Sequence, residues 1–268
     1  MTAPMLRRVS NQRPLPDRQR RPTNTQWSIT VAALCLATFL ALRLMLVLAN
    51  GPSALDVWLE DHIRHEDASR ALKLLEHLAS LPGSRKGAMA VTVSIGAWVW
   101  FRRRDVRPGI LLIAAFTGTA ATVSLLKKLL VLVWPIEAPG GDAARAFVSS
   151  HTANAVAVFA MLAVVVALSG RGDLLRLAVA GAVFMVGTVA LSVMAAGHHY
   201  FVDVVSGAAV GGVWVFALVP LGQLLWARPD LGGLPRRRHQ GDTVRGYSLE
   251  GITSERDLSA RQFNPPET

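Results

Sequence analysis

The sequence predicts an all-α integral membrane protein, a bundle of six transmembrane helices. Of its 268 residues 51% are hydrophobic, and the mean hydropathy is +0.36 although the chain carries 28 Lys and Arg residues. The apolar residues are grouped in stretches that reach, or nearly reach, the roughly 20 residues that a helix needs to cross the hydrocarbon. These stretches are residues 27–49, 87–101, 109–126, 152–169, 174–196 and 204–226.

Lys and Arg residues flank these stretches in a pattern that predicts the topology. They concentrate in the N-terminal tail, in the connections after the second and fourth stretches, and in the C-terminal tail. By the positive-inside rule these four segments are cytoplasmic, so both termini lie inside and the number of crossings is even, as six requires. A net charge of +10 arranged in this way indicates membrane flanks, which contact membrane lipids, and excludes a nucleic-acid surface. We expect a multi-pass protein of a bacterial inner membrane; the oligomeric state stays open.

The first outer connection, residues 50–86, combines nearly balanced charge with a helical apolar pattern. Its charged residues are Asp56, Glu60, Asp61, Glu66, Asp67 and Glu76 against Arg64, Arg70, Lys73, Arg85 and Lys86. Its apolar residues with roughly helical spacing are Leu55, Trp58, Leu59, Ile63, Ala71, Leu74, Leu75 and Leu78. This pattern predicts an amphipathic helix that lies on the membrane or caps the bundle.

Both tails differ in composition from the membrane domain. Residues 1–26 and 227–268 are rich in Pro, Arg, Gly and polar residues and have no apolar period. We therefore expect disordered cytoplasmic tails around a single membrane domain of residues 27–226.

Polar residues with phosphate-binding chemistry stand at the predicted outer ends of two stretches. Lys127 and Lys128 end the third stretch, and Ser149, Ser150 and His151 open the fourth. Interfacial lysines that snorkel and a serine N-cap are the ordinary explanations of such residues. A helix N-terminus with hydroxyls and free backbone N–H groups is nevertheless a ready phosphate site.

A histidine and an aspartate stand between the fifth and sixth stretches. His199 and Asp203 are four residues apart, so on a helix they share a face and the carboxylate can orient one imidazole nitrogen while the other points outward. A nucleophilic or general-base histidine needs this arrangement. The neighbouring His198 is the alternative, but the spacing to Asp203 favours His199.

At these residues the sequence resembles the membrane branch of the type 2 phosphatidic acid phosphatase (PAP2) superfamily. The family's first motif, Lys, six residues and Arg-Pro, aligns with Lys127 through Trp134-Pro135. Its second motif, Pro-Ser-Gly-His, aligns with residues 148–151, and its third, Ser-Arg, five residues, His, three residues and Asp, aligns with residues 192–203. The resemblance covers roughly residues 27–226 and implies six spans with an outward-facing site.

This chain departs from the family pattern at both motif arginines. They are replaced by Trp134 and Val193, and the Pro and Gly of the second motif by Val148 and Ser150. In the family the arginines clamp the phosphate oxygens, and an apolar side chain does not replace a guanidinium. Two explanations stay open. Either Lys128 and Arg145, on the same outer side, supply positive charge, or the chain belongs to a divergent subgroup with a reduced clamp.

The resemblance implies a phosphoric ester hydrolase that acts on a lipid phosphate from the periplasmic or exterior side. His199 would form a phosphohistidine, Asp203 would fix its tautomer, and His151 would be the general acid and base. The phosphate-binding set would be Lys127, Ser149, Ser150, Lys128 and Arg145. No metal ion or other cofactor is implied.

Candidate substrates are phosphatidic acid, phosphatidylglycerol phosphate and a polyprenyl diphosphate. Two alternatives are a lipid headgroup phosphotransferase that uses the same histidines and aspartate, and a noncatalytic membrane binding or scaffold protein of the same fold.

Overall fold

The computed structural model describes residues 24–49, 51–64, 69–133 and 147–228, and the regular structure in these ranges is helical. The expected all-α fold is confirmed. The tails expected to be disordered lie outside the described residues, apart from the few next to the first and last helices. Within the described part of the chain, the first helix begins at Asn24 and the last ends at Ala227.

Five helical segments of the described chain are long and apolar enough to cross a membrane. They are formed by α1 (Asn24–Ala49), α5 (Arg107–Val133), the continuous α6 (Ser150–Ala155), η2 (Val156–Ala160) and α7 (Met161–Leu168), α8 (Gly172–Ala195), and α9 (Phe201–Ala217) with α10 (Val219–Ala227). Each contains most of one stretch expected from the sequence. The bundle is therefore that of a multi-pass membrane protein.

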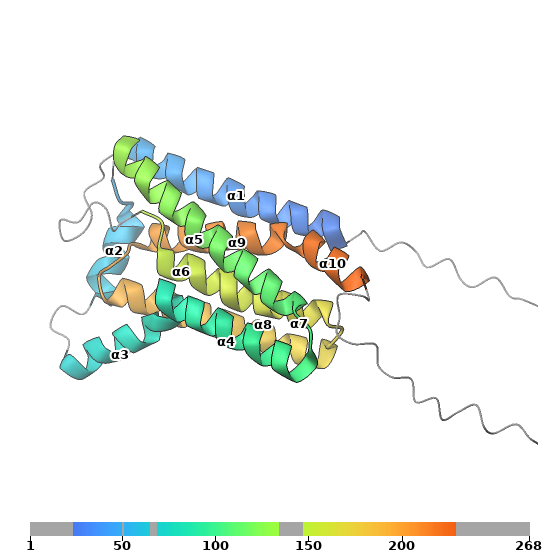
Figure 1. The fold of residues 1–268 in the computed structure, drawn as a ribbon. Coiled ribbons are helices and arrows are strands. Elements are labelled where there is room, and N and C mark those ends of the chain that lie inside the picture. The colour runs from blue at the N-terminus through green and yellow to red at the C-terminus, as the bar shows by residue number, and fades with distance from the viewer. Residues whose placement is uncertain (1–23, 50, 65–68, 134–146, 229–268) are drawn as a thin grey trace, which may run out of the picture. The chain divides into compact units, whose positions relative to one another are not determined.

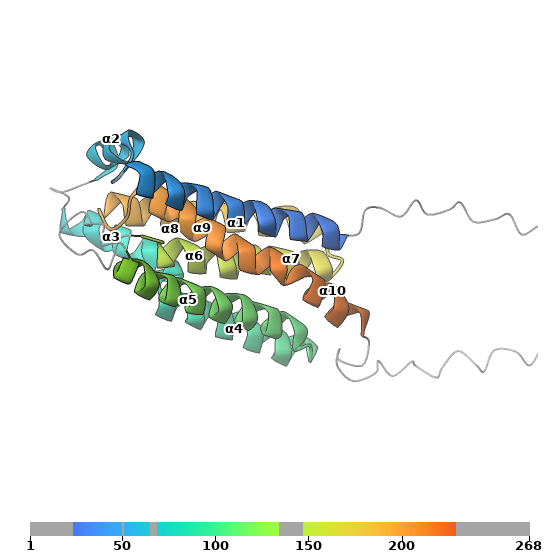
Figure 2. The same ribbon diagram turned by 90° about the horizontal axis from the view of Figure 1, so that it is seen from above.

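The remaining expected stretch, residues 87–101, lies inside α4 (Arg85–Arg103). This helix differs from the five apolar segments because it has basic residues at both ends. Its 19 residues span about 28 Å, close to the roughly 30 Å of the hydrocarbon core. It packs along α5 as a further member of the bundle (Figure 1, Figure 2).

The two ends of the bundle differ in structure. The start of α1 and the end of α10 lie at one end, and the short helices α2 (Ala54–Ile63) and α3 (Arg70–Ser80) lie at the other (Figure 1). The last turns of α5 and α8 and the first turns of α6 and α9 also meet at the α2 and α3 end. All three motifs therefore approach one another at this end.

The connection of residues 50–86, where the sequence predicted an amphipathic helix, contains two helices, α2 and α3. Ser69 caps the start of α3, where its Oγ accepts a hydrogen bond from the Leu72 N–H at 3.3 Å. This cap starts a new helix that the apolar spacing alone did not reveal. Leu59 and Ile63 of α2 pack against the bundle, whereas the leucines of α3 are largely exposed. The 3₁₀ turn η1 (Leu81–Gly83) then leads into α4.

Close packing of α6 against α9 forms the centre of the bundle near the α2 and α3 end. Gly207 and Gly211 lie one helical turn apart on α9, and a methyl group at Gly211 would lie 2.6 Å from the Ala153 carbonyl oxygen. Small residues at this spacing let two membrane helices approach closely. A core of Leu111, Leu112, Met161 and Val215 fills the other half.

Candidate active site

The second motif forms the start of the fourth membrane segment, as expected. Ser149 is the N-cap of α6 and is fully buried, and its Oγ accepts a hydrogen bond from the Thr152 N–H at 3.4 Å. Ser150 is the first residue of the helix and is partly exposed. Val148, just before the cap, has φ of 68°, a left-handed conformation that a β-branched residue rarely adopts. Strained backbone of this kind is often found at functional sites.

The third motif places its histidine next to its aspartate, although the histidine is outside the helix. Because α9 begins at Phe201, His199 precedes the helix and Asp203 lies in its first turn. Asp203 Oδ2 accepts a hydrogen bond from the Tyr200 N–H at 3.0 Å and lies 3.7 Å from His199 Nδ1. The two side chains are only 3% and 6% exposed. A contact of 3.7 Å is within ion-pair range and longer than a hydrogen bond, and it directs Nε2 away from the carboxylate.

A direct backbone hydrogen bond joins the second and third motifs. The Ser149 N–H donates to the carbonyl oxygen of Asp203 at 3.0 Å. On the next turn of α9, Gly207 lies against the Ser149 carbonyl group so closely that a Cβ atom would collide with its oxygen. The start of α6 and the start of α9 are thus held in a fixed relation.

Lys127 and His151 belong to the same cluster. His199 and Lys127 both lie near enough to His151 to interact with it electrostatically. Lys127 also interacts electrostatically with Asp203. His151 Nδ1 is buried and has no hydrogen-bond partner among the described residues. A polar atom in this state is available for proton transfer to a bound group. Lys127, Ser149, His151, His199 and Asp203 therefore come together from three membrane segments.

The other predicted site residues are placed differently. Lys128 is exposed on α5, and no contact described for it reaches the two histidines or Asp203. Arg145 lies outside the described residues, as does Trp134. Val193, at the position of the second motif arginine, is buried against Met194 and Val204 and belongs to the apolar core. The two arginine positions therefore do not contribute a described cation to the cluster.

Arg85 is a cation near Lys127 that sequence reasoning did not connect with the motifs. Its Nη2 donates a hydrogen bond to Ser124 Oγ at 2.7 Å, and it is near enough to Lys127 to act on its charge. From the sequence Arg85 is one of several charges in the first outer connection. Its position at the start of an apolar stretch is the signal that could have suggested a place near the motifs.

Helix α2 supports the histidine-bearing turn from outside the bundle. Asp56 is buried, and its Oδ1 accepts a hydrogen bond from the Val202 N–H at 2.9 Å in the first turn of α9. Its Oδ2 accepts from the Ser53 N–H at 3.0 Å, which caps α2 itself. One carboxylate thus caps the starts of two helices.

Glu60 and Arg64, on the same face of α2, also reach this turn. Arg64 Nη1 donates a hydrogen bond to Glu60 Oε1 at 2.9 Å. The Arg64 side chain also packs over Gly197, where a Cβ atom would lie 2.9 Å from Arg64 Nε. Gly197 has φ of 69°, so both its conformation and its neighbour favour glycine. Burial raises the pKa of the Tyr200 phenol above its ordinary value, and the Glu60 carboxylate raises it further.

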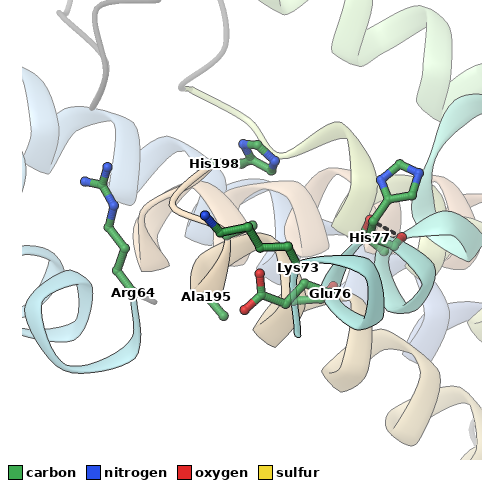
Figure 3. A pocket seen from close by; sticks show the side chains of 9 residues that line it. Arg64, Lys73, Glu76, His77, Ala195 and His198 are labelled. Carbon is green, nitrogen blue, oxygen red and sulfur yellow. Dashed lines mark hydrogen bonds between the residues drawn. The ribbon is translucent and has the colours of Figure 1, made fainter. Parts of the chain in front are cut away.

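A cavity of about 470 Å³ lies between α3 and the end of α8 (Figure 3). Its lining residues are Arg64, Lys73, Glu76, His77, Ser80, Ser192, Ala195, Ala196 and His198. Two of these, His77 and His198, are near enough to His151 to interact with it electrostatically. His198 thus lines the cavity, while His199 faces Asp203. No group of three or more His, Cys, Asp or Glu side chains within the described ranges is arranged to hold a metal ion.

Comparisons with known proteins agree with this architecture. The family model of the PAP2 superfamily matches residues 109–226. A similar solved structure is the crystal structure of the first transmembrane PAP2 type phosphatidylglycerolphosphate phosphatase from Bacillus subtilis. It is 19% identical in sequence, with a TM-score of 0.55, over 71% of this chain and 94% of that chain, and so shares the fold. No curated protein sequence matches this chain significantly. The segment that carries all three motifs is thus similar to the PAP2 superfamily, and the helical bundle has the fold of a transmembrane PAP2 type phosphatase.

Proposed function

We propose that the protein is a membrane phosphatase that hydrolyses a lipid phosphate through a phosphohistidine at His199. The observation that carries this proposal is the convergence of the second and third motifs, in which Ser149 is bonded to Asp203 and Asp203 faces His199. Both histidines and the aspartate of the family pattern are present in one cluster. Such a cluster suits nucleophilic and acid-base catalysis on a phosphate ester.

In the first step His199 Nε2 attacks phosphorus with its lone pair. The N–P bond forms as the bond from phosphorus to the leaving oxygen breaks, and protonated His151 gives its proton to that oxygen. Asp203, beside Nδ1, holds the ring in the tautomer that keeps the lone pair on Nε2 and stabilises the positive charge that develops.

In the second step water replaces the histidine on phosphorus. Neutral His151 takes a proton from the water, whose oxygen forms the new P–O bond as the N–P bond breaks. Inorganic phosphate leaves, and His199 and His151 return to their starting states. No redox partner enters this sequence.

Positive charge and N–H donors at the outer end of the bundle would hold the non-bridging oxygens. Lys127 supplies an ammonium group, the Ser149 and Ser150 hydroxyls lie at the same helix start, and the first turn of the 19-residue α6 to α7 segment offers backbone N–H groups. These groups stabilise charge on a transferring phosphoryl group in a site already organised for it.

The substrate we propose is amphiphilic, with its tail in the bilayer and its headgroup at the outer end of the bundle. The cavity beside His198 gives a polar headgroup room next to the phosphorus, and Lys73 and Arg64 at its wall favour an anionic one. The basic flanks of the sequence place this end on the periplasmic side of a bacterial inner membrane, with both termini in the cytoplasm.

Release of inorganic phosphate by the purified protein in detergent tests the proposal. Lipids with one and with two phosphate groups would be compared, beside His199→Gln, which keeps a polar side chain but removes the nucleophilic nitrogen. We expect release by the wild type and none above background by the variant. Transfer of the phosphate-bearing group to an added alcohol, instead of release, would identify a phosphotransferase.

A further inference from the structure

We propose that Arg85 is the guanidinium that binds the substrate phosphate in this chain, in place of the two motif arginines it lacks. This inference rests on the proposed function and assigns a residue of the phosphate site from outside all three motifs.

The segment before α4 is packed directly on the His151 turn. Asn154 Nδ2 donates a hydrogen bond to the Gly83 carbonyl oxygen at 3.2 Å. A methyl group at Gly83 would lie 2.5 Å from the His151 carbonyl oxygen, so the two backbones are in contact. Arg85 follows two residues later, in the first turn of α4. Its start point is therefore fixed next to the second motif.

The guanidinium itself is held against the Lys127 face of α5. Arg85 Nη2 donates to Ser124 Oγ at 2.7 Å, and Ser124 and Lys127, three residues apart on a helix, share a face. Ser124 Oγ also donates to the Ala120 carbonyl oxygen at 2.7 Å, which fixes its acceptor lone pairs toward the guanidinium. A guanidinium has five N–H donors, so this bond leaves donors for phosphate oxygens.

Two cations held close together favour an anion between them. Arg85 and Lys127 repel each other when the site is empty, and a phosphate dianion would neutralise both. A guanidinium can bind two phosphate oxygens at once, which an ammonium cannot. The first motif of the family supplies a lysine and an arginine from one segment. In this chain Lys127 and Arg85 would supply the same two types of cation from two helices.

Lys86 is the matched comparison within the same turn. It carries the same charge and is also exposed, but it lies about 100° further around α4, and no contact with α5 is described for it. If net charge at this end of the bundle were all that mattered, the two positions would be equivalent.

Titration calorimetry with inorganic phosphate, and steady-state release from a lipid phosphate, test the proposal on the full-length protein in detergent. We expect Arg85→Gln to weaken phosphate binding and raise KM about tenfold or more, the usual effect of losing a hydrogen bond between charged groups. Arg85→Lys would fall between Arg85→Gln and the wild type, and Lys86→Gln would match the wild type. Thermal unfolding of each variant confirms folding, and Arg85→Lys serves if Arg85→Gln does not fold.

The outcomes separate this proposal from the function on which it rests. Equal phosphate affinities for Arg85→Gln and Lys86→Gln would overturn the role of Arg85, even if the wild type releases phosphate. Selective loss of phosphate binding in Arg85→Gln with no turnover in any variant would support the role of Arg85 and count against the phosphatase. Absence of phosphate binding by the wild type would overturn the role of Arg85 as well.

Discussion

The backbone N–H of Ser149 donates a hydrogen bond to the carbonyl oxygen of Asp203 at 3.0 Å. The bond joins the N-cap of α6 to the first turn of α9, and so ties the second motif to the third. Because it is a backbone interaction, it depends on how closely the two helices approach and not on which side chains they carry. In the proposed mechanism, the distance between the helices therefore determines whether His151 and His199 can act on the same phosphorus.

Gly207→Ala tests this dependence. The added methyl group would collide with the Ser149 carbonyl oxygen and push α9 away from α6. We expect activity to fall at least tenfold and stability by about 1–3 kcal/mol, the usual cost of overpacking. Gly181→Ala is the matched control, because nothing lies within 4 Å of a methyl group there. Equal activities of the two variants, measured by phosphate release, would contradict the role of the close approach.

Asp56→Ala tests the support that α2 gives to the histidine-bearing turn. Removing the carboxylate leaves the Val202 N–H without its acceptor and uncaps α2. We expect a loss of about 1–2 kcal/mol of stability, as for other lost helix caps, together with lower kcat. Asp61→Ala, on the exposed side of the same helix, should behave like the wild type. If thermal unfolding and kcat are the same for both variants, α2 does not position the site.

Lys73→Gln tests the proposed headgroup cavity. Lys73 lines it, while Arg70, three residues earlier on α3, does not. We expect a several-fold higher KM for a lipid with a bulky anionic headgroup and little change for a small soluble phosphate ester, which does not fill the cavity. Arg70→Gln should change neither value. A parallel rise in KM for both substrates would indicate that Lys73 acts outside the headgroup cavity.

His151→Gln tests the separation of acid-base and nucleophilic roles. Without a proton donor, esters with poor leaving groups should lose at least a hundredfold in rate, the typical contribution of general acid catalysis. An ester with a good leaving group needs no proton, so its first step should survive and the phosphoenzyme should accumulate. Rapid-quench measurement of the burst checks this. Loss of the burst with the good leaving group would transfer the nucleophilic role away from His199.

The apolar helices could be predicted from the sequence, because hydropathy is a local signal. The break between α2 and α3 could not be predicted from apolar spacing, since it depends on the Ser69 cap. His199 was expected beside Asp203 if the helix began at Tyr200, and α9 begins at Phe201. His199 lies before the helix, and Asp203 reaches it by folding back onto the Tyr200 N–H.

Contacts between distant segments were beyond prediction from one sequence. Asp56 and Val202 are 146 residues apart, and Arg85 and Ser124 are 39 apart. Neither pair has a local signature, since both depend on how helices pack. The cavity at His198 likewise arises only where α3 meets α8. The loss of the motif arginines was visible in the sequence, but the cation near Lys127 was not.

The central claim is that His199 carries the phosphoryl group. The most direct measurement is mass spectrometry of the wild type and of His199→Gln, quenched at alkaline pH during turnover of a lipid phosphate. We expect a phosphoryl group on His199 in the wild type and none on the variant. A phosphoryl group on His198 or His151, or wild-type turnover by His199→Gln, would contradict the claim.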